Sequence, residues 1–145
     1  MQPSLYDQDF YTWAGQQAEL LRQRQFERLD LVNLIEEVDD LGKRHYEQLE
    51  SRLVQLIAYL LKWQVQHWRR SNSWRATIRV QRTSIEKLLR RNPGLKSRLD
   101  EAMAESWPEA RDLAISETDL PDENFPQVCP YTLIAVLDPE FWPES

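Results

Sequence analysis

The sequence predicts an all-α protein, a four-helix up-and-down bundle with one long central helix and an irregular, proline-rich C-terminal segment. The 145 residues include only three glycines and are rich in good helix formers such as Leu, Glu, Gln and Arg. Apolar residues recur at helical spacing, and no strand pattern of any length is present. We expect one domain, residues 1–145, with a helical bundle over 1–120 and a tail over 121–145 packed on it.

The first helix is predicted from about Asp7 to Gln25. Asp7 and Asp9 lie near its start, where negative charge suits the helix dipole. Its apolar stripe, at spacings of three and four residues, consists of Phe10, Trp13, Ala14, Ala18 and Leu21.

The second and longest helix is predicted from about Leu31 to Arg69, with Asp30 as its N-cap. Gly42 favours a bend, since glycine costs about 1 kcal/mol in a helix interior relative to alanine. The apolar face of the first part consists of Leu31, Leu34, Ile35, Val38 and Leu41, and the inner stripe continues through Leu49, Leu53, Leu56, Leu60 and Trp63. Further apolar residues widen this stripe, so we expect the second part of the helix to form the centre of the core.

A third helix is predicted after a turn in which Ser71 or Ser73 is the N-cap, and it ends at the segment Asn92-Pro93-Gly94. Its buried stripe consists of Trp74, Ile78, Ile85, Leu88 and Leu89.

A fourth helical stretch should begin near Leu95 and be broken or bent by Pro108. Ser106 and Glu109 have the spacing of a capping box, which predicts that a helix restarts there. A short closing helix, 131–137, is expected within the proline-rich tail.

The composition favours a cytoplasmic protein without a membrane span. The apolar run 53–61 is bracketed by Arg52 and Lys62, and it is far shorter than the roughly 20 residues that a bilayer requires. The start of the chain has no pattern of a secretory signal. Cys129 is the single cysteine, so no intrachain disulfide can form and a reducing compartment is the simpler interpretation.

Charge is distributed unevenly along the chain, whose formal net charge is -6. Residues 1–42 contain three basic and nine acidic side chains, residues 43–98 contain fourteen and three, and residues 99–145 contain one and twelve. The basic middle therefore lies between two acidic flanks, which can serve as its partners within the chain or in another copy.

Five segments together resemble a bacterial, mainly cyanobacterial, domain-of-unknown-function family, number 29. They are YDQDFYTW at 6–13, LIEEVDDLG at 34–42, LLKWQ at 60–64, RSNSWRATI at 70–78 and FPQVCPYTL at 125–133. They occur in order over nearly the whole chain. The resemblance implies an all-helical bundle in a bacterial cytoplasm, and it brings no established activity, substrate or catalytic residue.

Basic side chains of the third helix and of the turn before it form one candidate site, for nucleic acid. Trp68 and Trp74 are interleaved with these side chains. Arginines in a row can follow phosphates, and an exposed tryptophan can stack on a base. The candidate residues are Arg69, Arg70, Arg75, Arg79, Arg82 and Arg90. The opposing interpretation is that the acidic flanks neutralise these arginines and that Trp74 is buried.

A second candidate site is an acidic cluster that could hold Mg²⁺ for nucleotide hydrolysis, consisting of Glu36, Glu37, Asp39 and Asp40. It contains pairs that are three or four residues apart on one helix, close enough to share a cation. The competing interpretation is an acidic face that binds arginines.

The remaining candidates are single residues that we expect to have packing roles. His45 and His67 continue the stripe of the long helix, and they are too far apart to share a metal. Cys129 precedes a proline, where a cysteine can be a haem ligand or a reactive thiol, but it is interpreted as a small hydrophobic residue.

We therefore predict a non-catalytic module that binds a protein partner or another copy of itself, without a cofactor. Nucleic-acid binding and magnesium-dependent hydrolysis are the alternatives.

Overall fold

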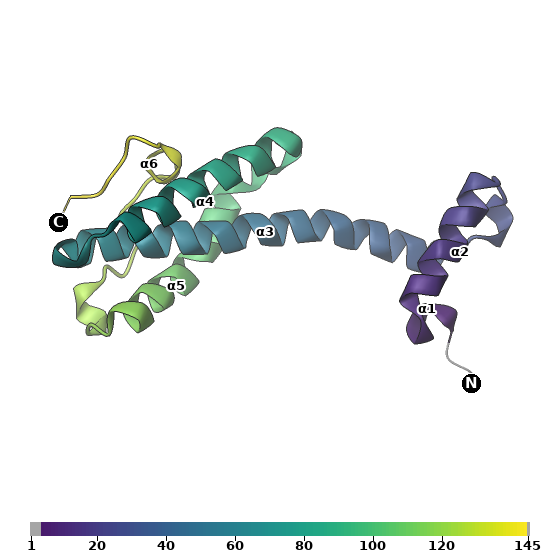
Figure 1. Ribbon diagram of the computed structural model, residues 1–145, viewed down its shortest axis with the longest axis horizontal. Coiled ribbons are helices and arrows are strands. Elements are labelled where there is room, and N and C mark those ends of the chain that lie inside the picture. Colours follow the sequence, from purple (N-terminus) through teal and green to yellow (C-terminus); the bar gives the residue numbers. More distant parts are fainter. Residues whose placement is uncertain (1–3, 145) are drawn as a thin grey trace. The chain divides into compact units, whose positions relative to one another are not determined.

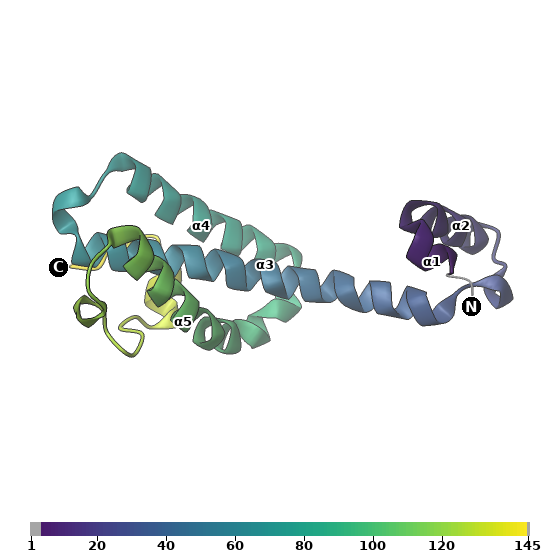
Figure 2. The ribbon, with the colours of Figure 1, turned by 90° about the horizontal axis from the view of Figure 1, so that it is seen from below.

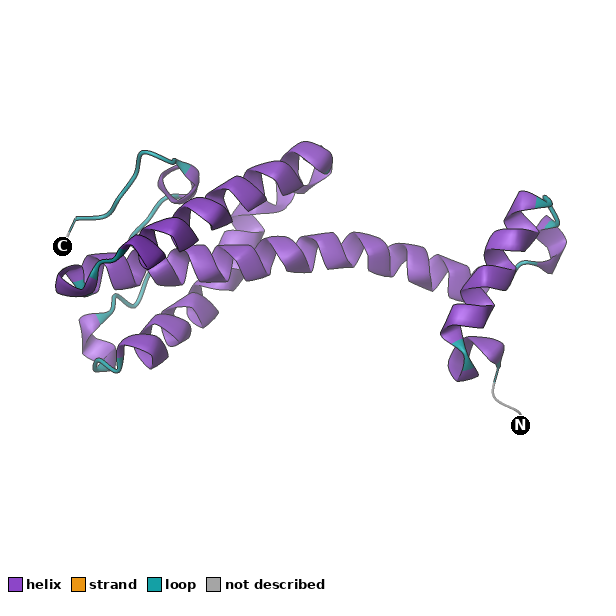
Figure 3. Ribbon diagram, in the orientation of Figure 1, coloured by secondary structure: helices purple, strands orange, loops and turns teal. Residues whose placement is uncertain are grey.

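The computed structural model describes residues 4–144, which form helices and loops with no strand among them (Figure 3). The all-α prediction is confirmed, and so is the long central helix. Packing divides the chain into two compact units, Met1–Arg44 and His45–Ser145, here called the N-terminal and C-terminal units. Helix α3 (Leu31–Val65) contributes residues to both.

The N-terminal unit contains α1 (Leu5–Gln8), α2 (Phe10–Arg22), a 3-10 turn at Phe26–Arg28 and the first part of α3 (Figure 1). One continuous helix was predicted over 7–25, but the backbone leaves the helical region at Asp9, with φ -150° and ψ 82°. The Asp9 carboxylate accepts a hydrogen bond from the Thr12 N–H at 3.1 Å. Asp9 is therefore an N-cap, and α2 begins after it.

The core of this unit is small and is built around Trp13, which is 4% exposed. Its indole Nε1 donates to Asp30 Oδ2 at 3.0 Å, and the Asp30 N–H donates to Gln17 Oε1 at 2.8 Å. The hydrogen bond from Asn33 is the main reason that the pKa of Asp30 is lowered. Asp30 thus connects α2 to the start of α3, where its Oδ1 also accepts from the Asn33 N–H at 3.4 Å, as predicted for an N-cap.

Helix α3 begins at the predicted residue and ends at Val65, four residues before the predicted end. A 3-10 turn, His67–Arg69, follows it. The Nε of Arg70 donates to the carbonyl of Trp63 at 2.7 Å. This side chain satisfies a carbonyl of the last turn, which the helix itself leaves without a donor.

The C-terminal unit packs α4 (Asn72–Arg91) and α5 (Leu99–Thr118) on either side of its part of α3 (Figure 2). Ser71 is the N-cap of α4, as predicted, since its Oγ accepts from the Trp74 N–H at 3.2 Å. A 3-10 helix, Pro93–Arg98, connects the two helices.

The predicted break at Pro108 is wrong, because α5 is continuous through it. Proline removes the N–H that would bond the carbonyl of Ala104, but both residues are exposed, so that carbonyl remains accessible to water. The predicted capping box does not form. Ser106 is buried instead, and its Oγ donates to the carbonyl of Ala102 at 2.6 Å.

The core of the C-terminal unit follows the predicted inner stripe of α3. Leu49, Leu53, Leu56 and Leu60 are fully buried. The other elements contribute Ile78 and Ile85 from α4, Ala102, Ala110 and Ala114 from α5, and Val136 from the tail. Each fully buried large apolar side chain stabilises the fold by roughly 1.5–3 kcal/mol.

After α5 the tail runs back over the C-terminal unit through a 3-10 turn, Asp122–Asn124, and the predicted short helix, α6 (Leu133–Leu137). Thr132 is its N-cap, with Oγ1 accepting from the Ala135 N–H at 3.1 Å. Arginine side chains donate hydrogen bonds to backbone carbonyls in the irregular parts of the tail. Arg111 donates to the carbonyls of Pro126 and Asp122 at 2.8 and 3.0 Å.

Candidate functional site

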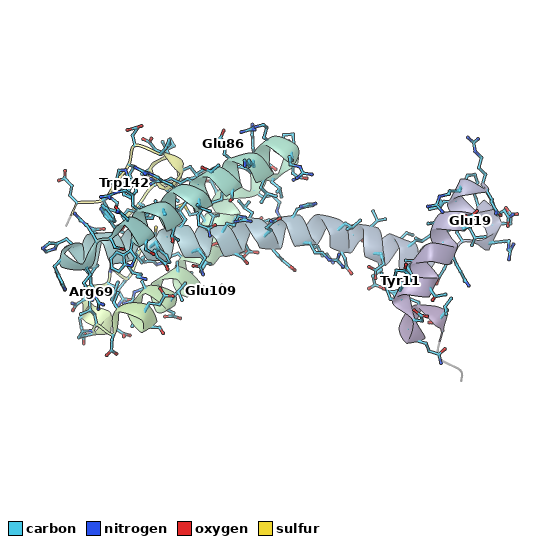
Figure 4. The ribbon with its side chains drawn as sticks, viewed as in Figure 1. Tyr11, Glu19, Arg69, Glu86, Glu109 and Trp142 are labelled. Atoms are coloured by element: carbon cyan, nitrogen blue, oxygen red, sulfur yellow. The ribbon has the colours of Figure 1, made fainter. Side chains whose placement is uncertain are left out.

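The arginines predicted to contact nucleic acid differ in what they contact. Arg82 is 6% exposed and packs inward, with Nε donating to the carbonyl of Val136 at 2.9 Å and Nη2 to that of Phe141 at 2.8 Å. Burial lowers its pKa. Its guanidinium lies 5.6 Å from the ring of Trp142, which Figure 4 shows beside α4. Arg82 therefore holds the tail on the core.

Three more of these arginines bond within the chain. Arg70 donates to the carbonyls of Trp63 and Pro143, as well as packing on the Trp63 ring. Arg75 donates to Asn72, and Arg90 forms an ion pair with Glu86 at 2.8 Å. Arg69 and Arg79 are exposed and form no ion pair within residues 4–144. The set is therefore not one free basic face, and its binding of nucleic acid stays a prediction.

The acidic cluster lies on the N-terminal part of α3. Tyr6 donates a hydrogen bond to Glu37, and that bond raises the pKa of Tyr6 to about 12. Glu36 and Asp39 are exposed, and Asp40 is half-buried. Within residues 4–144, no three carboxylate, imidazole or thiol groups are placed to hold a metal ion. The magnesium site stays a prediction.

The packing roles predicted for His45, His67 and Cys129 are not all confirmed by the structure. His45 and His67 are both exposed, so the interpretation that they pack in the stripe is wrong. For His67 the reason is that α3 has already ended. Cys129 is half-buried, its Sγ lies 3.5 Å from the carbonyl of Tyr131, and burial raises the pKa of its thiol. Burial disfavours the reactive thiolate, which agrees with a packing role.

A buried ion pair was not anticipated. Lys62 is 6% exposed, and its Nζ lies 2.8 Å from Glu117 of α5 and 4.0 Å from the ring centre of Tyr59. The signal in the sequence was a lysine in an otherwise apolar run. The identity of its partner, 55 residues away, could come only from the structure.

One side of the N-terminal part of α3 is apolar and exposed. Leu31, Ile35, Val38 and Leu41, here called the α3 stripe, are each more than half exposed, and so is the neighbouring Val32. They recur every three or four residues, which places them along one side of the helix. The sequence indicated an apolar face here, but the structure leaves that face uncovered within the N-terminal unit.

Comparison with known proteins identifies the family. Residues 5–142 match the model of the domain of unknown function DUF29. The chain therefore belongs to the DUF29 family, as the resemblance implied. No curated protein and no solved structure matches it. Within residues 4–144, no helix combines the length and the apolar character needed to cross a membrane.

Proposed function

We propose that the chain is a non-catalytic self-association module in which a second copy covers the α3 stripe. The observation that carries this proposal is the exposure of apolar residues at helical spacing on one side of α3. Large contiguous apolar patches are uncommon on monomers, and they mark surfaces at which proteins associate.

The small core of the N-terminal unit supports the proposal. Trp13 is its one buried apolar side chain within residues 4–44, whereas the four residues of the α3 stripe remain exposed. Covering the stripe would bury apolar area worth about 25 cal/mol per Å². Units of about 40 residues commonly need oligomerisation, a metal or disulfides to gain enough burial.

Charges beside the stripe favour a second copy in antiparallel orientation. Asp39 and Lys43 are exposed, lie on the same flank of the stripe, and form no ion pair within residues 4–144. If two α3 helices cross near Leu41, Asp39 comes level with Lys43 of the partner subunit. A parallel pair would place like charges together, and flanking charges set helix orientation in this way. The pairing would be symmetric, as in most homodimers.

The test is the mass of the protein in solution against its concentration, measured by sedimentation equilibrium. We expect twice the monomer mass for the natural chain and the monomer mass for Val38→Glu, since a charge in the stripe must be desolvated on pairing. Val80→Glu is the matched control, because Val80 is exposed to a similar degree on α4, outside the stripe. A natural chain that stays monomeric at every reachable concentration would contradict the proposal.

Nucleic-acid binding is the second proposal, supported only by the exposure of Arg69 and Arg79. Fluorescence anisotropy with short oligonucleotides at two salt concentrations tests it. Binding through phosphates must weaken steeply with salt and must be reduced in the double variant Arg69→Gln, Arg79→Gln.

A further inference from the structure

A groove between α3 and α4 in the C-terminal unit is lined almost entirely by hydrogen-bond donors. Its volume is about 350 Å³, and one apolar side chain, Leu88, contributes to its wall. The basic side chains are His45 and Arg52 from α3 and Lys87 and Arg91 from α4. Gln48, Ser84 and Asn92 complete the lining, which includes no carboxylate among the described residues 4–144. This combination joins positions from two helices, so spacing along the chain does not reveal it.

The basic groups of the groove have no ion-pair partner among the residues that the structure describes. Arg52, Lys87 and Arg91 form no ion pair within residues 4–144. Glu86 is adjacent to Lys87 in sequence, but it pairs with Arg90 at 2.8 Å. Charges of one sign that line a hollow repel one another, and a bound anion removes that repulsion.

The walls of the groove are held in place independently of any ligand. Arg52 Nη1 donates to Gln81 Oε1 at 3.3 Å, which links α3 to α4. Asn92 Nδ2 donates to the carbonyl of Leu88 at 3.0 Å and thus secures the end of α4. Leu88 is buried. The donors therefore project from a rigid two-helix wall, which limits the conformational cost of binding.

The spread of the hydrogen-bond donors indicates the size of the ligand. The Cα atoms of His45 and Arg52 are about 10 Å apart along α3, and those of Lys87 and Arg91 are about 6 Å apart along α4. One phosphate group is too small to contact both ends. We propose that this groove binds a small anion with two linked phosphate groups, in which arginine grips phosphate oxygens at two points and lysine acts as a point charge.

Isothermal titration calorimetry with sodium pyrophosphate, without divalent metal and at fixed ionic strength, tests the proposal. We expect saturable binding of one pyrophosphate per chain, and weaker binding of inorganic phosphate and sulfate. Arg52→Gln and Arg91→Gln should each weaken binding by about tenfold, the effect of losing one charge-assisted contact. Arg69→Gln is the matched control, because it makes the same change of charge at an exposed site outside the groove, and it should alter affinity by less than about twofold.

A titration with adenosine diphosphate distinguishes an inorganic diphosphate ligand from a phosphorylated organic ligand. If adenosine diphosphate binds as tightly as pyrophosphate, the groove recognises the diphosphate alone. If adenosine diphosphate binds more tightly, the ligand is a phosphorylated organic molecule that also contacts Leu88. Thermal unfolding of each variant without ligand separates lost binding from lost folding. The proposal is overturned if pyrophosphate gives no saturable heat, if Arg69→Gln weakens binding as much as Arg91→Gln, or if only oligonucleotides bind.

Discussion

Arg82 of α4 donates from Nε to the carbonyl oxygen of Val136 at 2.9 Å, and it thereby joins the middle of the sequence to the C-terminal tail. A second nitrogen, Nη2, donates to the carbonyl of Phe141 at 2.8 Å. The Val136 carbonyl lies in the last turn of the short helix α6 and the Phe141 carbonyl lies in irregular backbone, so both need donors from elsewhere in the chain. The planar, multi-donor guanidinium supplies them from a single side chain.

We expect Arg82→Met to lower the free energy of unfolding by roughly 2–4 kcal/mol, because it leaves buried carbonyls without donors. Chemical denaturation measures this change, and limited proteolysis should show faster cleavage of residues 138–144. Arg69→Met is the control, since Arg69 is exposed and its side chain forms no ion pair within residues 4–144. Equal stability of the two variants would mean that Arg82 does not hold the tail.

Replacing Lys62 and replacing Glu117 should lower the free energy of unfolding by different amounts. Lys62 is almost fully buried, whereas the side chain of Glu117 is 35% exposed. Glu117→Leu leaves a buried ammonium without its carboxylate, and we expect a cost of roughly 2–4 kcal/mol. Lys62→Met leaves a carboxylate that water can still reach, so its cost should be smaller. Urea denaturation measures the loss of unfolding free energy in both variants. A larger loss for Lys62→Met than for Glu117→Leu would contradict this prediction.

Glu50 and Glu105 form a carboxyl pair beside Tyr46, whose hydroxyl donates to Glu105 at 2.9 Å. Burial, followed by the hydrogen bond with Glu105, raises the pKa of Glu50. A carboxyl whose pKa is higher in the folded state contributes stability below its unfolded pKa, and that stability is lost as pH rises through the folded pKa.

We therefore expect Glu50→Gln to raise the melting temperature at pH 7–8, because it removes the charge while keeping a polar side chain. Relative to the natural chain, this gain should shrink as pH falls to about 4, where the natural carboxyl is itself protonated. Thermal unfolding followed by circular dichroism from pH 4 to pH 8 measures it. Glu109→Gln, at an exposed position of α5, is the control, because Glu109 is not among the groups that raise the pKa of Glu50. A gain that does not change with pH would exclude this electrostatic cause.

The antiparallel arrangement can be tested by exchanging charges beside the α3 stripe. Asp39→Lys and Lys43→Asp should each weaken self-association, since each places like charges opposite one another across the proposed pair. The double variant restores opposite charges and should recover most of the dimer. Sedimentation equilibrium at low salt measures the dimer dissociation constants of the two single variants and the double variant. High salt should reduce the differences between these constants. If the double variant is as weak as the singles, the two residues do not meet in an antiparallel pair.

Much of the fold could be predicted from residue spacing. The stripe Leu49, Leu53, Leu56 and Leu60 is fully buried as predicted, and α3 begins directly after Asp30. These features depend on helical periodicity and on a cap that acts on nearby N–H groups. Two helix boundaries were predicted wrongly. The Asp9 carboxylate caps α2 and so interrupts the helix predicted over 7–25. Pro108, which was expected to break or bend α5, lies at an exposed position inside a continuous helix.

The candidate sites were less predictable than the helices. The arginines of α4 were correctly assigned to one basic helix, yet the helical spacing could not show that Arg82 donates to the tail. The groove residues Arg52 and Arg91 are far apart in the sequence, and they line one groove only because α3 packs beside α4. A contact between distant residues depends on how elements pack, and local spacing does not specify it.

The sequence by itself determined that this chain is helical, where its long helix begins and which side of that helix is apolar, because propensity, capping and periodicity act between residues close along the chain. Only the tertiary structure decided which apolar side chains are covered and which charges are neutralised. It buries Leu49 and leaves Val38 exposed, and it pairs Lys62 with Glu117 but leaves Arg91 without an ion pair in residues 4–144. Burial and pairing depend on packing between distant segments.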